Sequence, residues 1–264
     1  MQILQTGLDL EAFFARVRAA STRVLMLDYD GTLAPFRVDP AQAAPYPGVV
    51  PLLDAIMATG RTRLLIVSGR WTRDLIPLLG LRRVPEIWGS HGWERLHPDG
   101  GYEAAPIDPP VRARLSQMEE WVGQVEPLGG RCERKPSGMA IHWRGLDNAR
   151  RSEIRNVVFQ KWMETGYAED LDWHDFDGGI ELRAPGRDKG DVVRTISSEG
   201  GADSVFAYLG DDLTDESAFD AMPAGGLSVL VRPEFRRTHA GLWLHPPGDL
   251  LDFLNRWHTA AGHD

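Results

Sequence analysis

The sequence predicts an α/β fold, in which a parallel sheet is interrupted by a smaller α+β unit. Four short apolar runs lie far apart in the chain, and polar residues follow each one directly: Val24–Leu27, Leu64–Val67, Val205–Leu209 and Leu227–Val231. Runs of about five apolar residues without alternation are typical of strands buried on both faces of a parallel sheet. Residues with helical periodicity lie between the runs, and alternating strands and helices indicate an open α/β sheet.

Composition excludes several other classes of protein. The 264 residues are 42% hydrophobic and 25% charged, which is ordinary globular usage and corresponds to one large domain or two modest ones. The net charge of −9, without a basic stripe, argues against nucleic acid as a partner. A single cysteine, Cys132, excludes an intrachain disulfide and a cysteine-rich metal site.

The chain shows no sign of a membrane or secreted protein. No apolar stretch approaches the roughly 20 residues that a bilayer span needs. The first residues, MQILQTGLDLEAFF, lack the basic start and apolar core of a signal peptide. We therefore expect a cytoplasmic protein with no membrane partner, and we expect it to be a monomer.

The first half of the predicted sheet ends in two polar motifs. The strand Val24–Leu27 leads into Asp28-Tyr29-Asp30-Gly31-Thr32. An apolar stripe from Val49 to Met57, stopped by Gly60, predicts the next helix. The strand Leu64–Val67 then leads into Ser68-Gly69-Arg70.

The stretch 106–183 breaks this rhythm. Its predicted order is αββαββ, with the second hairpin turning at Asp177-Gly178. Asp147 is the expected N-cap of the second helix. In order, the expected elements are a helix over Pro109–Glu126, strands over Arg131–Lys135 and Met139–Arg144, a helix over Asp147–Thr165, and strands over Leu171–Asp175 and Gly179–Arg183. We predict an inserted domain at 106–183 between two parts of a core domain, 1–105 and 184–264.

The second half of the sheet brings a further acidic motif. The strand Val205–Leu209 leads into Gly210-Asp211-Asp212, and Leu227–Val231 leads into Arg232-Pro233. Ligands of open α/β sheets bind beyond the carboxyl ends of the strands. The polar residues at these ends are therefore expected to converge on one crevice: Asp28, Asp30, Ser68, Asp211 and Asp212.

Asp28 and Asp30 are the candidate catalytic residues. Two carboxylates one residue apart at a strand tip can divide the work, because one can attack an electrophile while the other, protonated, donates to the leaving oxygen. The alternative is that they are ordinary turn residues, since Asp and Gly are common in turns.

The second acidic cluster, Gly210 to Glu216, suggests a magnesium site. Hard oxygen donors without a nearby His or Cys suit Mg²⁺ rather than zinc. A solvated first turn of a helix would also favour acids, and Asp215 and Glu216 fit that alternative. Asp211, next to the strand, is the better candidate ligand.

Two further motifs suit a phosphate group. Lys189 precedes an apolar-periodic helix and would neutralise phosphate charge, although most lysines lie on the surface. Ser68-Gly69-Arg70 offers a hydroxyl and backbone N–H groups at a strand-to-helix turn.

These motifs, in this order, resemble the haloacid dehalogenase superfamily of phosphotransferases. That superfamily carries an Asp-x-Asp motif, a Ser or Thr, a Lys and an acidic pair at strand ends of a Rossmann-like sheet. Asp30 resembles the phosphatase and mutase branch, and the position of the αββαββ insert resembles a large-cap subgroup that acts on sugar phosphates.

Within the subgroup, the chain resembles the trehalose-6-phosphate phosphatase family along nearly its whole length. The segments that carry this resemblance are Leu27-Asp28-Tyr29-Asp30-Gly31-Thr32-Leu33-Ala34-Pro35, Gly89-Ser90-His91-Gly92, Glu133-Arg134-Lys135 with Ala140-Ile141-His142-Trp143-Arg144, and Gly210-Asp211-Asp212-Leu213-Thr214-Asp215-Glu216.

The resemblance implies a Mg²⁺-dependent phosphatase with an aspartyl-phosphate intermediate. Asp28 would be the nucleophile and Asp30 the acid and base. The metal would be held by Asp28, the Asp30 main-chain carbonyl and Asp211, with Asp212 in an outer position. Ser68, Gly69 and Arg70 would bind the phosphate, together with Lys189. The candidate contacts to the sugar are His91, Lys135, His142, Arg144, Glu181 and Arg183; His91 and His142 fit a structural role equally well.

Two other functions remain open. A phosphatase for another small sugar phosphate, of the sucrose phosphate or mannosyl-phosphoglycerate type, would share every core motif. A non-catalytic sugar-phosphate-binding regulator would be expected to lack Asp28, Asp30 or Lys189, and all three are present. The resemblance disfavours a mutase, whose cap is usually helical.

Overall fold

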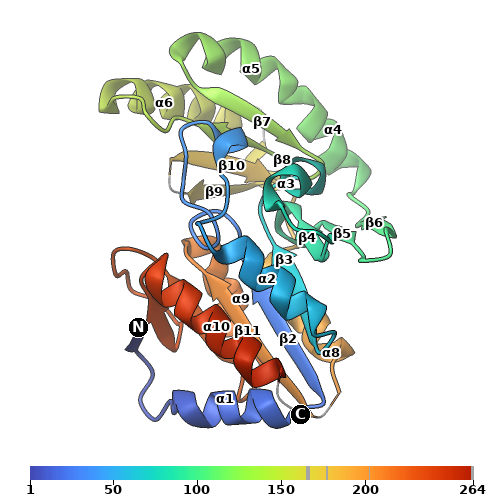
Figure 1. The fold of residues 1–264 in the computed structure, drawn as a ribbon. Helices are drawn as coiled ribbons and strands as arrows, with labels where there is room; N and C mark the ends of the chain where they lie inside the picture. The colour runs from blue at the N-terminus through green and yellow to red at the C-terminus, as the bar shows by residue number, and fades with distance from the viewer. Residues whose placement is uncertain (165–166, 177, 202, 263–264) are drawn as a thin grey trace. The chain divides into compact units, whose positions relative to one another are not determined.

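The computed structural model describes residues 1–164, 167–176, 178–201 and 203–262 (Figure 1). The chain divides into two compact units, each continuous in space: Met1–Glu103 with Asp188–Asp264, the core unit, and Ala104–Arg187, the inserted unit. None of the helices in these described ranges is long and apolar enough to cross a lipid bilayer.

The core unit is built on a nine-stranded sheet of order β1-β13-β12-β11-β2-β3-β4-β5-β6. Its central strands are parallel, and all four predicted runs lie among them: β2 (Thr22–Leu27), β3 (Thr62–Val67), β11 (Ser204–Gly210) and β12 (Leu227–Val231). Sequence analysis did not identify the remaining strands: β1 (Gln2–Ile3), β4 (Glu86–Gly89), β5 (Glu94–Leu96), β6 (Tyr102–Ala104) and β13 (Leu242–Leu244). The α/β fold class is confirmed.

Helices bury both faces of this sheet, which explains the unbroken apolar runs. Leu25 and Leu27 of β2 pack into one hydrophobic cluster and Val24 and Met26 into another. The first cluster lies under α1 (Leu10–Ala19), α2 (Val49–Ala58), α3 (Thr72–Leu79) and α10 (Gly248–Gly262). The second lies under α8 (Lys189–Glu199) and α9 (Glu216–Asp220). In Figure 1, α2 and α10 pass in front of the sheet.

Short 3₁₀ helices follow several strands or connect them: η1 (Pro40–Gln42), η2 (Ser90–Gly92) and η4 (Leu213–Asp215).

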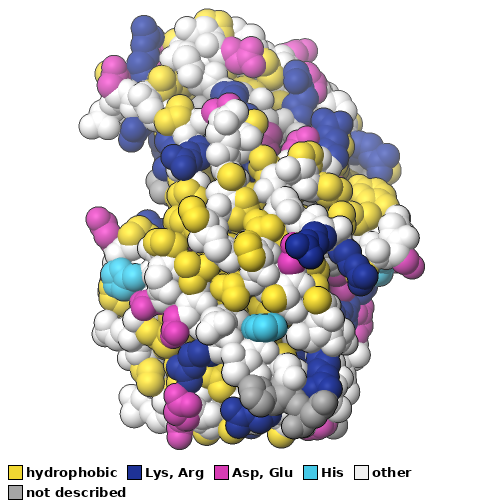
Figure 2. Space-filling model, in the orientation of Figure 1, with side chains coloured by type: hydrophobic (Ala, Val, Ile, Leu, Met, Phe, Trp, Pro, Cys, Tyr) yellow, Lys and Arg dark blue, Asp and Glu magenta, His cyan; other side chains and the backbone are white. Residues whose placement is uncertain are grey.

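On the face drawn in Figure 2, basic, acidic and hydrophobic side chains are interspersed. A groove along the outer side of α2 is lined by residues that include Val50, Met57 and Arg83. None of the predicted site residues lines it.

The inserted unit is an antiparallel sheet covered by helices on one face. Its strand order is β7-β8-β10-β9, and its strands are β7 (Arg131–Lys135), β8 (Gly138–His142), β9 (Asp172–Phe176) and β10 (Gly179–Arg183). Its helices are α4 (Pro109–Gln117), α5 (Glu119–Val125), η3 (Glu126–Leu128), α6 (Asn148–Glu164) and α7 (Tyr167–Asp170). Alternate strand residues such as Ile141 and Ile180 pack against Trp121 and Ile154 of the helices.

Two predicted elements of the inserted unit are corrected. The single helix over Pro109–Glu126 is wrong, because α4 ends at Gln117 and α5 begins at Glu119. A tight turn at Met118, whose carbonyl accepts the Trp121 N–H at 2.9 Å, directs the Met118 and Trp121 side chains into the core. The second strand ends at His142 rather than Arg144.

Two other expectations for this unit, a helix cap and a strand pairing, are met. Asp147 caps α6, because its Oδ1 accepts the Arg150 N–H at 2.9 Å. The predicted hairpin pairs β9 with β10, although Thr165 and Asp177 of the predicted elements lie outside the described residues. The predicted insert at 106–183 falls within the unit Ala104–Arg187, and its role as a cap domain stays a proposal.

Candidate active site

Adjacent strands of the core sheet place two acidic motifs side by side. Asp28 follows β2 and Asp211 follows β11, and these strands are parallel neighbours with Leu27 beside Leu209. The Asp28 N–H donates to the Leu209 carbonyl at 2.8 Å. Carboxylate oxygens of Asp28, Asp211 and Asp215 all lie within 4.8 Å of one another, and all three residues are buried. The carboxyl ends of the strands thus form a compact acidic cluster.

Lys189 supplies a positive charge to this cluster. It is the first residue of α8, and its Nζ donates to Asp28 Oδ1 at 2.6 Å and to Asp215 Oδ1 at 2.7 Å. Burial would lower the pKa of Lys189, but the charges of Asp215 and Asp28 outweigh burial and raise it. The ammonium group therefore stays protonated beside Asp28.

Asp215 orients this site, a role that sequence reasoning missed. Its Oδ1 also accepts the Tyr208 hydroxyl at 2.7 Å, and its Oδ2 accepts the N–H groups of Asp211 and Asp212 at 3.0 Å each. Burial would raise the pKa of Asp215, but Lys189 and these donors lower it. Asp215 is fully buried, so the alternative of a solvated helix turn is wrong for this residue. The available signal was its position three residues after Asp212, which permits a capping box.

Asp28 keeps one oxygen available. Its Oδ2 is buried and has no hydrogen-bond partner among the described residues. Burial, together with the charges of Asp215 and Asp30, raises the pKa of Asp28 to about 7 against the lowering effect of Lys189. An unpartnered carboxylate oxygen in the site is well placed to meet an electrophile or a cation.

The charges of the cluster fit a divalent cation. Three buried carboxylates, Asp28, Asp211 and Asp215, face the single ammonium group of Lys189. Burial, followed by the charges of Asp28 and Asp215, raises the pKa of Asp211 well above its ordinary value. A hard cation with oxygen ligands would relieve this repulsion. The residues present therefore suit the Mg²⁺ that the sequence predicts.

Gly31 makes room for Asp211. Its φ of +84° lies in the left-handed region, where glycine is favoured. A Cβ at this position would also collide with the Asp211 carboxylate. The Asp28–Thr32 turn and the Asp211 turn can pack this closely only with glycine at position 31.

The Ser68-Gly69-Arg70 turn follows β3, the strand beside β2. The Arg70 N–H donates to Ser68 Oγ at 3.1 Å. The Arg70 guanidinium forms a bidentate pair with Asp30, with both N–O distances at 2.6 Å. The predicted phosphate-binding arginine and the predicted acid thus contact each other, which sequence analysis did not anticipate.

Two other predicted residues of the core unit have clear positions. His91 lies against Gly69, because a Cβ on Gly69 would be 2.5 Å from the His91 Nε2 atom. Asp212 is partly exposed, and its Oδ1 caps η4 by accepting the Leu213 N–H at 2.8 Å. Neither Asp212 nor the Asp30 carboxylate belongs to the buried cluster found among the described residues.

The inserted unit carries a separate polar cluster on the sheet face opposite its helices. Lys135 Nζ donates to Glu181 Oε1 at 2.7 Å, and His142 Nε2 lies 2.7 Å from Glu133 Oε2. Strand register places Glu133 and Glu181 on either side of Ala140. Glu133 was not among the predicted site residues, although its spacing of two from Lys135 on a strand puts both on one face.

The charges of this second cluster and its burial shift the pKa values of its members. Burial would raise the pKa of Glu133, but Lys135 and His142 lower it to about 2. Burial would lower the pKa of Lys135, but Glu181 and Glu133 raise it. Burial lowers the pKa of His142 despite Glu133. These residues hold one another in fixed positions.

Arg183 and Arg144 occupy different ends of the inserted sheet. Arg183 pairs in register with Gly138, next to Lys135. It is buried, and its Nε and Nη1 have no hydrogen-bond partner among the described residues. Arg144 lies beside the β9–β10 hairpin, because a Cβ on Gly178 would be 2.9 Å from its Nη2.

Comparison with known proteins identifies relatives along most of the chain. A model of the family described as trehalose-phosphatase matches residues 26–239. The trehalose-phosphate phosphatase of Mycobacterium marinum is 32% identical over 252 residues, which cover 88% of this chain and 60% of that protein. The Mycobacterium tuberculosis protein of the same name is 30% identical over 254 residues, with the same coverage. The chain spans about 60% of the length of these curated relatives.

Solved structures match the fold over nearly the whole chain. The C-terminal domain of Candida albicans trehalose-6-phosphate phosphatase superposes with a TM-score of 0.80 at 22% identity, covering 98% of this chain and 99% of that one. An Aspergillus fumigatus trehalose-6-phosphate phosphatase gives a TM-score of 0.65 at 25% identity, covering 96% and 98%.

Proposed function

Because the chain belongs to the trehalose-phosphatase family, we propose that it is a Mg²⁺-dependent phosphatase that hydrolyses trehalose 6-phosphate to trehalose and phosphate. The observation that carries this proposal is the buried Asp28 carboxylate, which Lys189 holds by one oxygen while the other has no partner among the described residues. Such a group is positioned to attack phosphorus, and the acidic cluster around it suits a divalent cation.

In the first half-reaction, Asp28 Oδ2 attacks the phosphorus atom and the bond from phosphorus to the sugar oxygen breaks. Asp30 gives its proton to the departing oxygen, so trehalose leaves as an alcohol and an aspartyl-phosphate remains on Asp28. Arg70 holds the Asp30 carboxylate in the structure described here. The productive complex therefore requires Arg70 to yield part of this contact to the substrate.

In the second half-reaction, Asp30 takes a proton from water, which attacks the phosphorus atom. The bond to Asp28 breaks, phosphate leaves and the carboxylate is restored. Lys189 stays protonated and keeps Asp28 oriented throughout.

The phosphoryl group would be bound by Ser68 Oγ, the backbone N–H groups of the Ser68-Gly69-Arg70 turn, Arg70 and Lys189. Mg²⁺, when bound, would be held by Asp28, the Asp30 main-chain carbonyl and Asp211, with Asp212 in an outer position, and would neutralise charge on the phosphoryl oxygens. Asp215 acts through Lys189 rather than on the substrate.

Sugar recognition is assigned mainly to the inserted unit acting as a cap, with His91 as the one proposed contact from the core unit. We place residues 1–105 and 184–264 in the catalytic core and 106–183 in the cap. The residues proposed to contact the sugar are His91, Lys135, His142, Arg144, Glu181 and Arg183, to which we add Glu133 because it contacts His142. A preorganised cluster of charged donors and acceptors suits the hydroxyl groups of a disaccharide.

A substrate panel tests this function. Phosphate release is measured from trehalose 6-phosphate, sucrose 6-phosphate, mannosyl-phosphoglycerate and glucose 6-phosphate, each with Mg²⁺ and with excess chelator, and with Asp28→Asn as the inactive control. We expect turnover of trehalose 6-phosphate that requires Mg²⁺. Turnover of another sugar phosphate alone would reassign the substrate, and binding without turnover would favour a regulator. Full activity in chelator would exclude the metal.

A further inference from the structure

The loop after β4 adopts a backbone conformation that its residues do not favour. Ser90 and His91 are adjacent and have φ values of 49° and 57°. They are the two non-glycine residues with positive φ in the described part of the chain. For a residue with a side chain, the left-handed region costs conformational free energy. Such residues persist where the surroundings hold them, often next to functional sites.

Glu94 on β5 holds this loop. Ser90 Oγ donates to Glu94 Oε1 at 2.5 Å, and the Tyr102 hydroxyl donates to Glu94 Oε2 at 3.0 Å. Ser90 is fully buried and Glu94 is 1% exposed. The antiparallel register pairs Glu94 with Gly89, the residue before Ser90. A buried carboxylate that accepts hydrogen bonds from two hydroxyl groups is a strong anchor for a strained residue.

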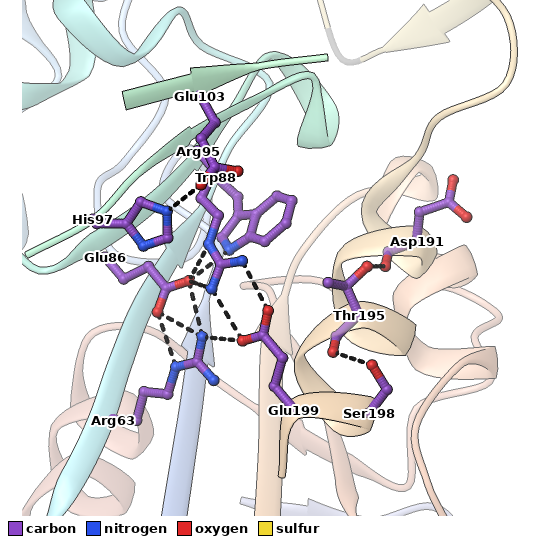
Figure 3. A network of polar contacts seen from close by, with 10 residues as sticks. All are labelled: Arg63, Glu86, Trp88, Arg95, His97, Glu103, Asp191, Thr195, Ser198 and Glu199. Atoms are coloured by element: carbon purple, nitrogen blue, oxygen red, sulfur yellow. Dashed lines mark hydrogen bonds and ion pairs between the residues drawn. The ribbon is translucent and has the colours of Figure 1, made fainter. Parts of the chain in front are cut away.

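The strand that carries Glu94 is itself fixed by its next residue. Arg95 donates to Glu86 at the start of β4 and to Glu199 at the end of α8, at distances between 2.8 and 3.0 Å. Figure 3 shows Arg95 between these two carboxylates, with Arg63 bound to the same pair. β5 is therefore tied both to the sheet and to the helix that begins at Lys189.

The loop in turn holds the phosphate-binding turn proposed above. The Ser90 N–H donates to the Arg70 carbonyl at 2.8 Å, and the His91 N–H donates to the Ser68 carbonyl at 3.0 Å. The left-handed conformation directs two successive N–H groups at the two ends of Ser68-Gly69-Arg70. The His91 ring also packs against Gly69.

We propose that Glu94 is a positioning residue for phosphate binding, which holds Ser90 left-handed so that the loop N–H groups fix the Ser68–Arg70 turn. This inference rests on the proposed function for the role of that turn. Glu94 touches neither substrate nor metal in this scheme. Loss of its anchor allows Ser90 to relax toward ordinary backbone conformations, and the turn then loses its shape.

Three variants separate positioning from plain stabilisation. Glu94→Ala removes the anchor, and Ser90→Ala removes the hydroxyl while a Cβ still opposes the left-handed conformation. Ser90→Gly removes the same hydroxyl, but glycine adopts positive φ without help. Glu103→Ala, an exposed carboxylate on β6 that pairs with His97, is the matched control. Inorganic phosphate is the probe, measured as a competitive inhibitor of aryl phosphate hydrolysis and by direct calorimetry.

We expect Glu94→Ala and Ser90→Ala to weaken phosphate binding by about 10-fold or more, because the relaxed turn loses about one hydrogen bond to the charged phosphate. Ser90→Gly should recover most of that affinity, although both Ser90 variants lose the same hydrogen bond. Amide hydrogen exchange of a peptide covering residues 66–72 should accelerate in the two alanine variants, and Glu103→Ala should match the wild type.

The outcomes are distinct. If the wild type releases phosphate but Ser90→Ala and Ser90→Gly bind it equally, or if Glu94→Ala shows wild-type binding and exchange, the inference is overturned. If the wild type neither binds nor releases phosphate, the proposed function fails, while the exchange measurement still tests the loop. If Glu94→Ala does not fold, Glu94→Gln replaces it, with an intermediate loss of affinity expected because the neutral amide is a weaker acceptor.

Discussion

Asp28 and Asp215 contact the same lysine, but their surroundings give them different chemistry. Asp215 uses both oxygens to accept hydrogen bonds from Lys189, Tyr208 and two backbone N–H groups. Asp28 uses one oxygen for Lys189 and leaves the other unpartnered among the described residues. A saturated carboxylate is a poor nucleophile, so this geometry supports the proposal that Asp28 attacks phosphorus and Asp215 orients Lys189.

Substitution of the two aspartates of the first motif should affect phosphate release in different ways. Asp28→Asn should abolish phosphate release and leave no phosphorylated protein detectable by intact mass. Asp30→Asn should slow trehalose 6-phosphate hydrolysis by about 10²–10⁴, the usual contribution of a general acid or base. Hydrolysis of an aryl phosphate should slow less, because its leaving group needs little protonation. Wild-type turnover by Asp28→Asn would contradict a covalent mechanism.

The Glu133 carboxylate should make the free energy of unfolding depend on pH. Lys135 and His142 outweigh burial and hold the pKa of Glu133 at about 2, against 4.5 for the ordinary side chain. A lowered pKa stabilises the folded state above the unfolded value, and this stability is lost as the pH falls through 4.5 toward 2. The upper limit is roughly 3 kcal/mol at neutral pH.

Denaturant unfolding of the wild type and Glu133→Gln between pH 7 and pH 3 measures how much the Glu133 charge contributes to the free energy of unfolding. We expect the difference in the free energy of unfolding to shrink by more than half over that range. Glu153→Gln, an exposed carboxylate on α6 paired with Arg150, should show a small difference with little pH dependence. A constant difference for Glu133→Gln would show that its charge does not stabilise the fold.

Individual site residues could be predicted where the chain itself places them at strand ends. Asp28 and Asp211 were identified in this way, and Lys189 from its place at the start of a predicted helix; the structure brings all three together. The pairing of Arg70 with Asp30 joins residues 40 apart, and that of Lys189 with Asp215 joins residues 26 apart. Local sequence carries no signal for such contacts, so Asp215 looked like an ordinary acid of a helix turn.

At the scale of elements, apolar runs predicted strands only where burial is complete on both faces. β4 was missed because it begins with Glu86, a buried charge that Arg63 and Arg95 neutralise from other strands. The break between α4 and α5 was missed because Met118 is apolar and suits an unbroken stripe. In both cases tertiary contacts outweigh the local pattern.

The first turn of α8 is the element that positions Lys189. Asp188 caps it by accepting the Asp191 N–H at 2.9 Å, and Asp191 accepts the Asp188 N–H in return. Asp188→Ala should reduce the free energy of unfolding by about 1 kcal/mol and lower kcat several-fold, because the turn that carries Lys189 frays. Asp188→Asn should retain both, since asparagine caps equally well. Equal losses in the two variants, measured by urea unfolding and steady-state kinetics, would contradict a capping role.

At the scale of the whole molecule, the chain builds three separate hydrophobic clusters, two in the core unit and one in the inserted unit. The core unit packs helices on both faces of its sheet, whereas the inserted unit covers one face and leaves a charged cluster on the other. This division favours separate tasks, with phosphate chemistry in the core unit and sugar recognition in the inserted unit. Substitutions can test that division directly.

Variants of the inserted unit should therefore discriminate between substrates, because the sugar contacts are absent from a small aryl phosphate. Lys135→Ala and Glu181→Ala each remove one member of a buried ion pair. Each should lower kcat/KM for trehalose 6-phosphate by about 10- to 100-fold, the value of one charged hydrogen bond, because remote binding energy is used for orientation. Hydrolysis of the aryl phosphate should change little.

The control variants distinguish the two units. Lys189→Ala should impair hydrolysis of both substrates, and Glu153→Ala, exposed on α6, should impair hydrolysis of neither. Circular dichroism and thermal unfolding establish that each variant is folded. If folded Lys135→Ala and Glu181→Ala lost both activities in equal measure, these residues would serve the chemical step, and the proposed division between the two units would be wrong.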